Sequence, residues 1–267
     1  MELLSSLFAS SGEYFISFFQ NANLIGILLA ILFGVFWLIF YKPPFLKNDW
    51  LWIILITSAV ITLLATAFIQ LPLQIAVGKF FYANWAEEQL MKGILFTSLP
   101  TILIGCLIQE GAKLLPVIAY WWHKNKKIVP NFGLIIGAVA GAGFGVFEAQ
   151  AMHNALFAMG WTWDAVGTLG FNALLPFIER FFFVAFSIAM TALAGYGLAK
   201  DMGWQFYLIV SGVHGLINYL TVLMQIRLLS IEITETIIAL IAIGAVIVSL
   251  WLLKRKDPVA KTDSRKT

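Results

Sequence analysis

The feature that most constrains this chain is the recurrence of apolar stretches long enough to cross a lipid bilayer. A transmembrane helix needs about 20 mostly apolar residues, and seven stretches approach or exceed that length. They are Leu24–Tyr41, Leu51–Leu71, Ile94–Trp121, Phe132–Leu156, Leu174–Leu198, Trp204–Met224 and Ile231–Leu253. Since backbone groups in lipid must bond within their own segment, the stretches predict an all-α membrane bundle with seven transmembrane helices.

The composition agrees with this class and excludes others. The chain is 61% hydrophobic and 12% charged, whereas an ordinary soluble domain is about 25% charged. Cys106 is the only cysteine, which excludes an internal disulfide and disfavours a cysteine-based metal cluster. The basic residues are divided between short loops and the tail, so the lipid bilayer is the expected partner and no nucleic acid is.

The basic residues outside the predicted spans fall almost entirely on one side. That side holds Lys42, Lys47, Lys124, Lys126, Lys127, Lys200 and the basic residues that follow Leu253. The opposite side holds Lys79, Lys92 and Arg227. Because cytoplasmic loops are enriched in Lys and Arg, we expect the N-terminus outside and the C-terminus in the cytoplasm.

The same pattern divides the chain into three parts. Residues 1–23 form an amphipathic segment that we expect to lie along the membrane interface. Residues 24–253 form the seven-span membrane domain, with the polar motifs within about 94–224. Residues 254–267 form a basic cytoplasmic tail.

Ionisable side chains interrupt several of these apolar stretches. They are Glu110, Lys113, Glu148, Glu179, Arg180 and His214. An ionised group at mid-depth costs at least roughly 2.5–3.5 kcal/mol, so such groups persist where they pair or function. These residues are therefore the first candidates for chemistry.

The depths of these groups along their spans are similar. With a rise of about 1.5 Å per residue, Glu110, Glu148, His214 and Asn218 lie about 18, 24, 15 and 21 Å from the cytoplasmic side. Glu179 lies about 8 Å below the outer surface by the same rule. Different helices thus bring polar groups to one level, between the midplane and the outer face.

Neighbouring positions suggest how some of these groups meet. Glu110 and Lys113 are spaced i and i+3 and can pair on one helix face. His214 and Asn218 are spaced i and i+4 and share a face. Glycines recur every fourth residue in the stretch that carries Glu148, and small residues at this spacing allow close helix contact. We therefore expect that helix at the centre of the bundle.

Three short motifs occur in order on separate spans. They read QEGAK at 109–113, FGVFE at 144–148 and HGLIN at 214–218. Together they resemble the PrsW-like and YhfC-like families of intramembrane proteases, within the superfamily of CAAX-type proteases. The adjacent Glu179 and Arg180 look like a fourth motif of YhfC-like members. The resemblance implies an integral protein of the bacterial cytoplasmic membrane that cleaves a membrane-associated protein or peptide.

Two positions depart from the pattern of these families. Gln109 stands at the first Glu position, which in CAAX-type enzymes resembles a water-activating base, and Ser187 stands about where YhfC-like members carry a His. The Gln-Glu dipeptide and the seven-span plan also resemble the anterior-pharynx-defective scaffold subunit of gamma-secretase. A non-catalytic scaffold with a decayed site is therefore an alternative, and a small proton-coupled transporter is another, since buried Glu and His also serve proton relays.

The residue types assign roles in the peptidase interpretation. Glu148 could act as the base, His214 could orient water or act as an acid, and Asn218 could donate to an oxyanion. Glu110 is a further catalytic candidate and can also pair with Lys113. Lys113, Glu179 and Arg180 are expected to form supporting ion pairs, and because Glu179 and Arg180 point about 100° apart on a helix, each could have its partner elsewhere. Glu110, Glu148 and His214 could alternatively hold one zinc ion. The sequence leaves a metal mechanism and a glutamate mechanism both open.

Overall fold

The structure is a computed structural model that describes residues 2–124 and 128–255, with side chains from residue 11 onward. Most of the predicted tail and the loop residues Lys126 and Lys127 lie outside this described part. Within it there is no strand, and seven helical segments are long and apolar enough to cross a membrane. The predicted all-α membrane bundle is confirmed.

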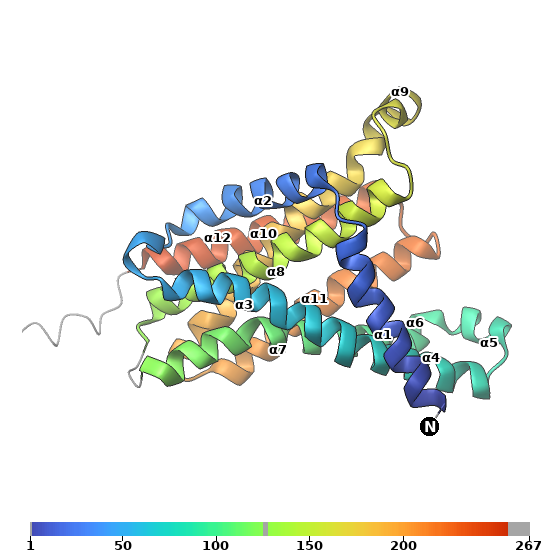
Figure 1. Ribbon diagram of the computed structural model, residues 1–267, viewed down its shortest axis with the longest axis horizontal. Coiled ribbons are helices and arrows are strands. Elements are labelled where there is room, and N and C mark those ends of the chain that lie inside the picture. The colour runs from blue at the N-terminus through green and yellow to red at the C-terminus, as the bar shows by residue number, and fades with distance from the viewer. Residues whose placement is uncertain (1, 125–127, 256–267) are drawn as a thin grey trace, which may run out of the picture.

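Figure 1 shows the helices and the course of the chain through them. In chain order they are α1 (Glu2–Gln20), α2 (Leu24–Leu38), η1 (Ile39–Tyr41), η2 (Phe45–Lys47), α3 (Trp50–Ala65), η3 (Thr66–Gln70), α4 (Leu71–Asn84), α5 (Glu87–Lys92), α6 (Ile94–Thr97), α7 (Leu99–Lys124), α8 (Pro130–Ala158), α9 (Asp164–Leu169), η4 (Gly170–Leu174), α10 (Leu175–Ala199), α11 (Gly203–Gln225) and α12 (Ile231–Lys254).

At each end of the bundle, a hydrogen bond joins the start of one span to the end of another, as expected when the spans alternate in direction. At one end, the backbone N–H of Asn23 before α2 donates to Asn154 Oδ1 near the end of α8 at 3.0 Å. At the other end, the Asn131 amide at the start of α8 donates to the Leu253 carbonyl at 3.2 Å. We call the first the outer end and the second the inner end, after the orientation that the charges predict.

Local sequence signals explain where several spans begin. Asn23 caps α2 by accepting from the backbone N–H groups of Ile25 and Gly26, and Ser230 caps α12 by accepting from Ile233. Pro130 and Pro176 stand in the first turns of α8 and α10, where the missing N–H costs nothing.

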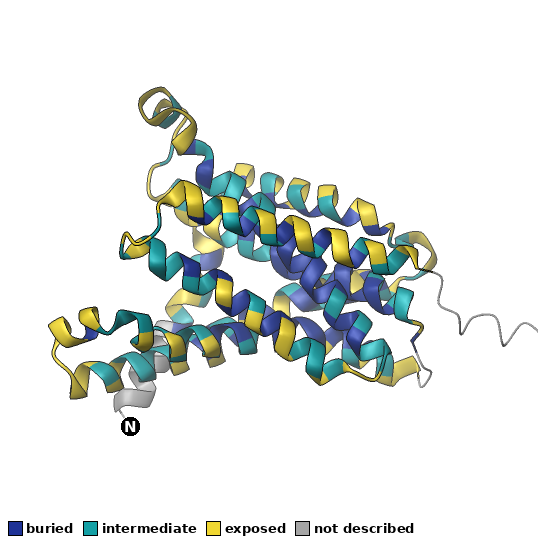
Figure 2. Cartoon of the chain, turned by 180° about the vertical axis from the view of Figure 1, so that it is seen from behind, coloured by how far each residue is buried: buried dark blue, intermediate teal, exposed yellow. Residues whose placement is uncertain are grey.

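Helices α8 and α10 are the most buried of the spans and pack against each other, and Figure 2 shows the buried residues gathered in the middle of the bundle. A Cβ at Gly133, Gly137 or Gly141 would collide with a backbone carbonyl of α10. The glycines therefore allow the two backbones to touch, one turn after another. The expectation that the Glu148 helix is central is confirmed, and it places polar side chains of α8 among protein groups.

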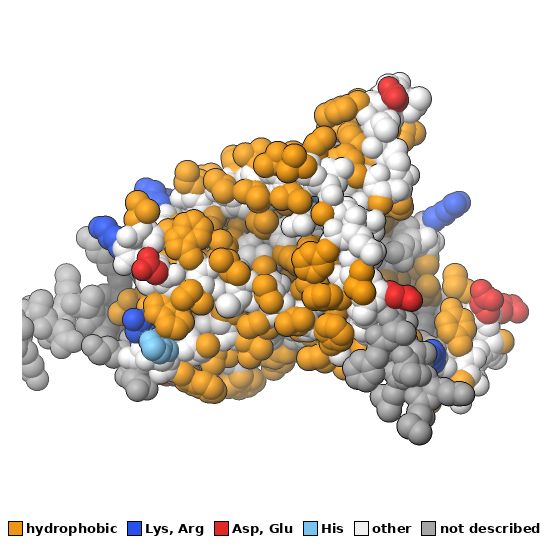
Figure 3. Space-filling view, in the orientation of Figure 1, with side chains coloured by type: hydrophobic (Ala, Val, Ile, Leu, Met, Phe, Trp, Pro, Cys, Tyr) orange, Lys and Arg blue, Asp and Glu red, His pale blue; other side chains and the backbone are white. Residues whose placement is uncertain are grey.

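The surface matches a protein surrounded by lipid. In Figure 3 hydrophobic side chains cover the flank of the bundle, and charged side chains gather toward its two ends. Large exposed apolar residues such as Leu28, Ile56 and Leu240 lie along the spans. This distribution is typical of helices whose outer faces contact acyl chains.

The second span is longer than the sequence predicted. Instead of ending at Leu71, the helix continues from Trp50 to Asn84 through the π-helical η3, a length of about 52 Å. The hydrocarbon core is only about 30 Å thick. Helix α4 therefore continues past the predicted boundary, and α5 and α6 lead back from it to α7 (Figure 1).

Helix α1 corresponds to the segment predicted to be amphipathic and interfacial. It packs against η3 and α4, and its Phe18 ring stacks on Phe147 of α8 at 4.1 Å between centroids. Its segment is not among the seven candidate spans. The helix thus crosses the outer part of the bundle next to Glu148.

Candidate functional site

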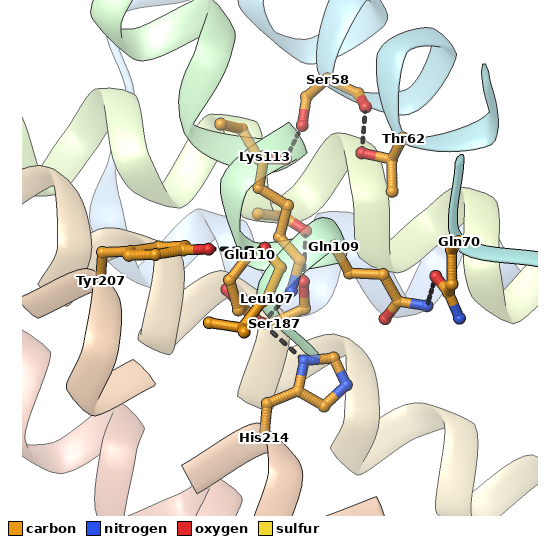
Figure 4. A network of polar contacts seen from close by, with 12 residues as sticks. Ser58, Thr62, Gln70, Leu107, Gln109, Glu110, Lys113, Ser187, Tyr207 and His214 are labelled. Atoms are coloured by element: carbon orange, nitrogen blue, oxygen red, sulfur yellow. Dashed lines mark hydrogen bonds and ion pairs between the residues drawn. The ribbon is translucent and has the colours of Figure 1, made fainter. Parts of the chain in front are cut away.

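A cluster of three ionisable side chains lies in the interior between α7 and α11 (Figure 4). Glu110 Oε1 accepts from Lys113 Nζ at 2.6 Å and from His214 Nδ1 at 2.7 Å. Their side chains are at most 1% exposed. The predicted Glu110–Lys113 pair is confirmed, and the predicted approach of His214 to Glu110 is a direct hydrogen bond.

Aromatic rings enclose this cluster. Lys113 Nζ lies 4.0 Å from the centroid of the Phe144 ring on α8. The His214 ring meets Phe183 and Phe186 of α10 edge-on at 5.7 and 5.8 Å. An ammonium over a ring face is attracted by the ring quadrupole, so Phe144 stabilises the buried cation and excludes water from it.

Within the cluster, opposite charges compensate each other and most polar atoms have a hydrogen-bond partner. Ionised Glu110 beside protonated Lys113 forms a neutral pair, and His214 then donates its Nδ1 hydrogen to the shared oxygen. The second oxygen, Glu110 Oε2, is buried without a hydrogen-bond partner among the described residues. A buried pair of this kind requires both members, because one charge left alone would be uncompensated.

Glu148 has a different environment. It is half-buried, and its Oε2 is enclosed without a hydrogen-bond partner in the described part of the chain. On α8 it stands one turn outward of Phe144, the ring that packs under Lys113. It is therefore a carboxylate on the central helix with one enclosed oxygen that still lacks a hydrogen-bond donor among the described residues, a need that an ordered water can meet.

Helix α1 brings the partly exposed Tyr14 into the neighbourhood of Glu148 from outside the spans. Burial raises the pKa of the Tyr14 phenol, and the nearby Glu148 carboxylate raises it further. Phe18 lies one turn along α1 from Tyr14 and stacks on Phe147, the neighbour of Glu148. Sequence reasoning missed this contact, although the aromatic side chains of residues 1–20 signalled a helix with a packing face.

Gln109, which replaces the first Glu of the family pattern, belongs to a separate chain of amides. Its Nε2 donates to Gln70 Oε1 at 3.0 Å, and Gln70 in turn donates to Gln74 at 3.4 Å. Gln74 donates to the Thr101 carbonyl at 2.8 Å. These bonds hold η3 and α4 against α7. The polar Gln70 within an apolar stretch was the available signal, and sequence reasoning did not use it.

Glu179 and Arg180 form an ion pair with each other on α10. The guanidinium carbon of Arg180 also lies 4.6 Å from the centroid of Phe183, one of the rings around His214. Arg180 is 8% exposed, and its Nε has no hydrogen-bond partner within the described residues. The structure thus pairs the two residues with each other, although adjacent positions on a helix point about 100° apart, and Arg180 retains an unused donor.

The remaining predicted residues occupy positions on α8, α10 and α11. Asn218 is half-buried and follows His214 by one turn on the same face of α11. Ser187 donates to the Gly141 carbonyl at 3.0 Å, so this hydroxyl links α10 to the glycine face of α8. His153, near the outer end of α8, is only 1% exposed, and its Nδ1 lies 3.0 Å from the Gly26 carbonyl oxygen.

The donor set does not fit a zinc ion. Glu110 Oε1 is already bonded to both Lys113 and His214. In the part of the chain that the structure describes, no group of three or more His, Cys, Asp or Glu side chains is arranged to hold a metal. We therefore derive no chemical step through a metal.

Comparison of the chain with protein-family models, with curated proteins and with solved structures found no match. Fold and site together define a polytopic helical membrane protein with an ionisable interior.

Proposed function

We propose that this protein is an intramembrane peptidase that cleaves a membrane-associated protein or peptide, with Glu148 as the base. The observation that supports it is the Glu148 carboxylate, half-buried on the central helix with an enclosed, unpartnered oxygen. A carboxylate of this kind can hold a water molecule and accept its proton.

The chemical step follows from that role. Glu148 accepts one proton from a bound water while the resulting hydroxide attacks the carbonyl carbon of the scissile peptide bond. The carbonyl oxygen then carries the negative charge. When the carbon–nitrogen bond breaks, protonated Glu148 returns its proton to the leaving amine, so the carboxylate is regenerated.

The developing oxyanion requires donors that are already in place. Asn218 and Arg180 are the candidates, since an amide and a guanidinium both donate hydrogen bonds to oxygen. The Arg180 Nε donor is unused among the described contacts. Glu179 would hold the guanidinium in position through their ion pair.

The buried cluster has a positioning role in this scheme. Glu110 fixes the His214 ring through Nδ1, and Lys113 balances the carboxylate charge. Asn218 is one turn from His214 on α11, so an ordered His214 also sets the position of Asn218. The motif resemblance of residues 109–113, 144–148 and 214–218 supports the same assignment.

A second candidate function is a non-catalytic membrane scaffold. Two observations favour it: Gln109 is engaged in the amide chain with Gln70, and the cluster of Glu110, Lys113 and His214 is fully buried. A site kept only for packing would show both features. A Gln at position 109 also cannot act as a base.

Reconstitution of the purified protein with a panel of quenched fluorogenic peptides, each fused to a transmembrane segment, tests the proposal. We expect a cleavage product by mass spectrometry, with cleavage unaffected by a chelator. Absence of any product across the panel, from a protein that is folded by circular dichroism, would favour the scaffold. Loss of cleavage with chelator and recovery with zinc would overturn the metal-free assignment.

A further inference from the structure

An apolar groove lies between α3 and α7, away from the site described above. Its volume is about 370 Å³, within the range of about 300–1,000 Å³ that is typical of ligand pockets. Its lining is apolar apart from the hydroxyl of Thr57, and that hydroxyl already donates to the Ile53 carbonyl at 2.6 Å. A hydrocarbon is the chemistry that such a lining accepts.

Two small residues and a proline stand among the bulkier apolar residues of the groove walls. Pro116 stands inside α7, where it removes a backbone hydrogen bond and disturbs the helix. Ala119 follows on the same wall and is exposed. Thr57 lies on the opposite wall. The groove thus opens toward the surroundings of the bundle, where lipid is expected.

Aromatic rings and cations mark the inner end of this groove. Trp50 and Trp122 line it, and the Trp50 ring lies 4.7 Å from the ring of His123. Lys124 ends α7, and Lys47 ends η2 just before α3. Asp49 is the acidic residue beside them. Figure 3 shows basic side chains gathered at this end of the bundle.

We propose that this groove binds one acyl chain of an anionic phospholipid, with the phosphate near Lys47 and Lys124. Tryptophan rings favour the membrane–water boundary, so Trp50 and Trp122 set the depth of the headgroup. Lysine clusters at the cytoplasmic surface attract anionic headgroups. The groove thus contacts the acyl chain, and the two lysines favour a lipid with an anionic headgroup.

Native mass spectrometry of the purified full chain tests this site. The protein is incubated with phosphatidylglycerol or with phosphatidylcholine of identical acyl chains, and the retained lipids are counted. We expect one phosphatidylglycerol to be retained in preference. Ala119→Trp should lower its retention at least fivefold by filling the groove. Lys47→Ala combined with Lys124→Ala should remove the headgroup preference.

Matched variants elsewhere control for bulk and charge. Leu240→Trp places the same ring on an exposed face of α12, and Lys92→Ala removes an exposed lysine from the end of α5. Both variants should retain phosphatidylglycerol as the natural chain does. Thr57→Phe fills the groove from the opposite wall and serves if Ala119→Trp does not fold. Equal retention by the groove and control variants, or retention indifferent to the headgroup, would overturn the proposal.

Discussion

Glu110 and Glu148 are the same residue type on two helices of the bundle, yet their surroundings differ. Glu110 is 1% exposed and bonded to a lysine and a histidine. Glu148 is half-buried and has a tyrosine of α1 nearby, while its Oε2, like Glu110 Oε2, is enclosed without a hydrogen-bond partner among the described residues. Removing one member of a buried charge pair is costly, whereas a half-buried carboxylate outside such a pair is available for chemistry.

The comparison predicts that breaking the Glu110 pair has the largest effect on stability. Lys113→Ala leaves the carboxylate buried without its cation, which typically costs about 3–5 kcal/mol. Thermal unfolding in detergent should show a large fall in Tm. The control Lys92→Ala removes an exposed bridge to Glu88, which contributes about 0–1 kcal/mol. Equal stability of the two variants would contradict the structural role of the cluster.

The double replacement of Glu110 by Gln and Lys113 by Met sharpens the same test. Removing both charges of a buried pair is often neutral or stabilising. We expect the double variant to recover most of the stability that Lys113→Ala loses. A double variant as unstable as the single one would show that packing, and not charge, is responsible.

A smaller effect is expected at His214. In His214→Phe the ring stays among Phe183 and Phe186, but the bond to Glu110 is lost. Leaving a charged acceptor with one donor fewer should cost about 1–3 kcal/mol. Cleavage should also fall, because Asn218 then loses its ordered neighbour. If both Tm and cleavage were unchanged, His214 would have neither the stabilising role nor the positioning role proposed for it.

Gln109→Glu should change cleavage by less than about tenfold, since proton transfer is assigned to Glu148. The variant loses the Nε2 bond to Gln70, so a modest fall in stability is expected as well. If Gln109→Glu instead creates cleavage in a chain that has none, the natural protein is a decayed member of the family that it resembles. Glu148 would then not act as a base in the natural protein, and its difference from Glu110 would have no catalytic meaning.

The smallest expected effect concerns α1 and pH. Tyr14 has a pKa raised above its ordinary value of 10.0 by burial and by Glu148. The neutral phenol therefore contributes to the packing of α1 below about pH 10, and this contribution is lost as pH rises through the folded-state pKa. A spin label at Gln20→Cys should become more mobile above that pH. In Tyr14→Phe the transition should disappear, and its persistence would assign it to another group.

The fold could be predicted from the sequence because hydrophobic length is a local property. The Glu110–Lys113 pair followed from helical spacing, and the approach of His214 followed from its depth along α11. The course of α1 beside Glu148, the burial of His153 and the bond from Gln109 to Gln70 could not be predicted. Each of them depends on contacts between segments far apart in the chain, and hydropathy carries no information about those contacts.

The extension of α3 through η3 into α4 shows the same limit. Hydropathy ended the span near Leu71, where polar residues become frequent. The helix continues because Gln70 and Gln74 bond to α7, and such bonds satisfy polar groups that a lipid-facing helix would have to avoid. A side-chain network between helices thus overrode a local signal.

The most direct test of the central claim compares Glu148→Gln with the natural chain in the reconstituted cleavage assay. The replacement keeps the size and most hydrogen bonding of the side chain but removes proton acceptance. The account predicts that cleavage falls by on the order of 10²-fold or more while Tm is unchanged. Cleavage at the natural rate by a folded Glu148→Gln protein would contradict it.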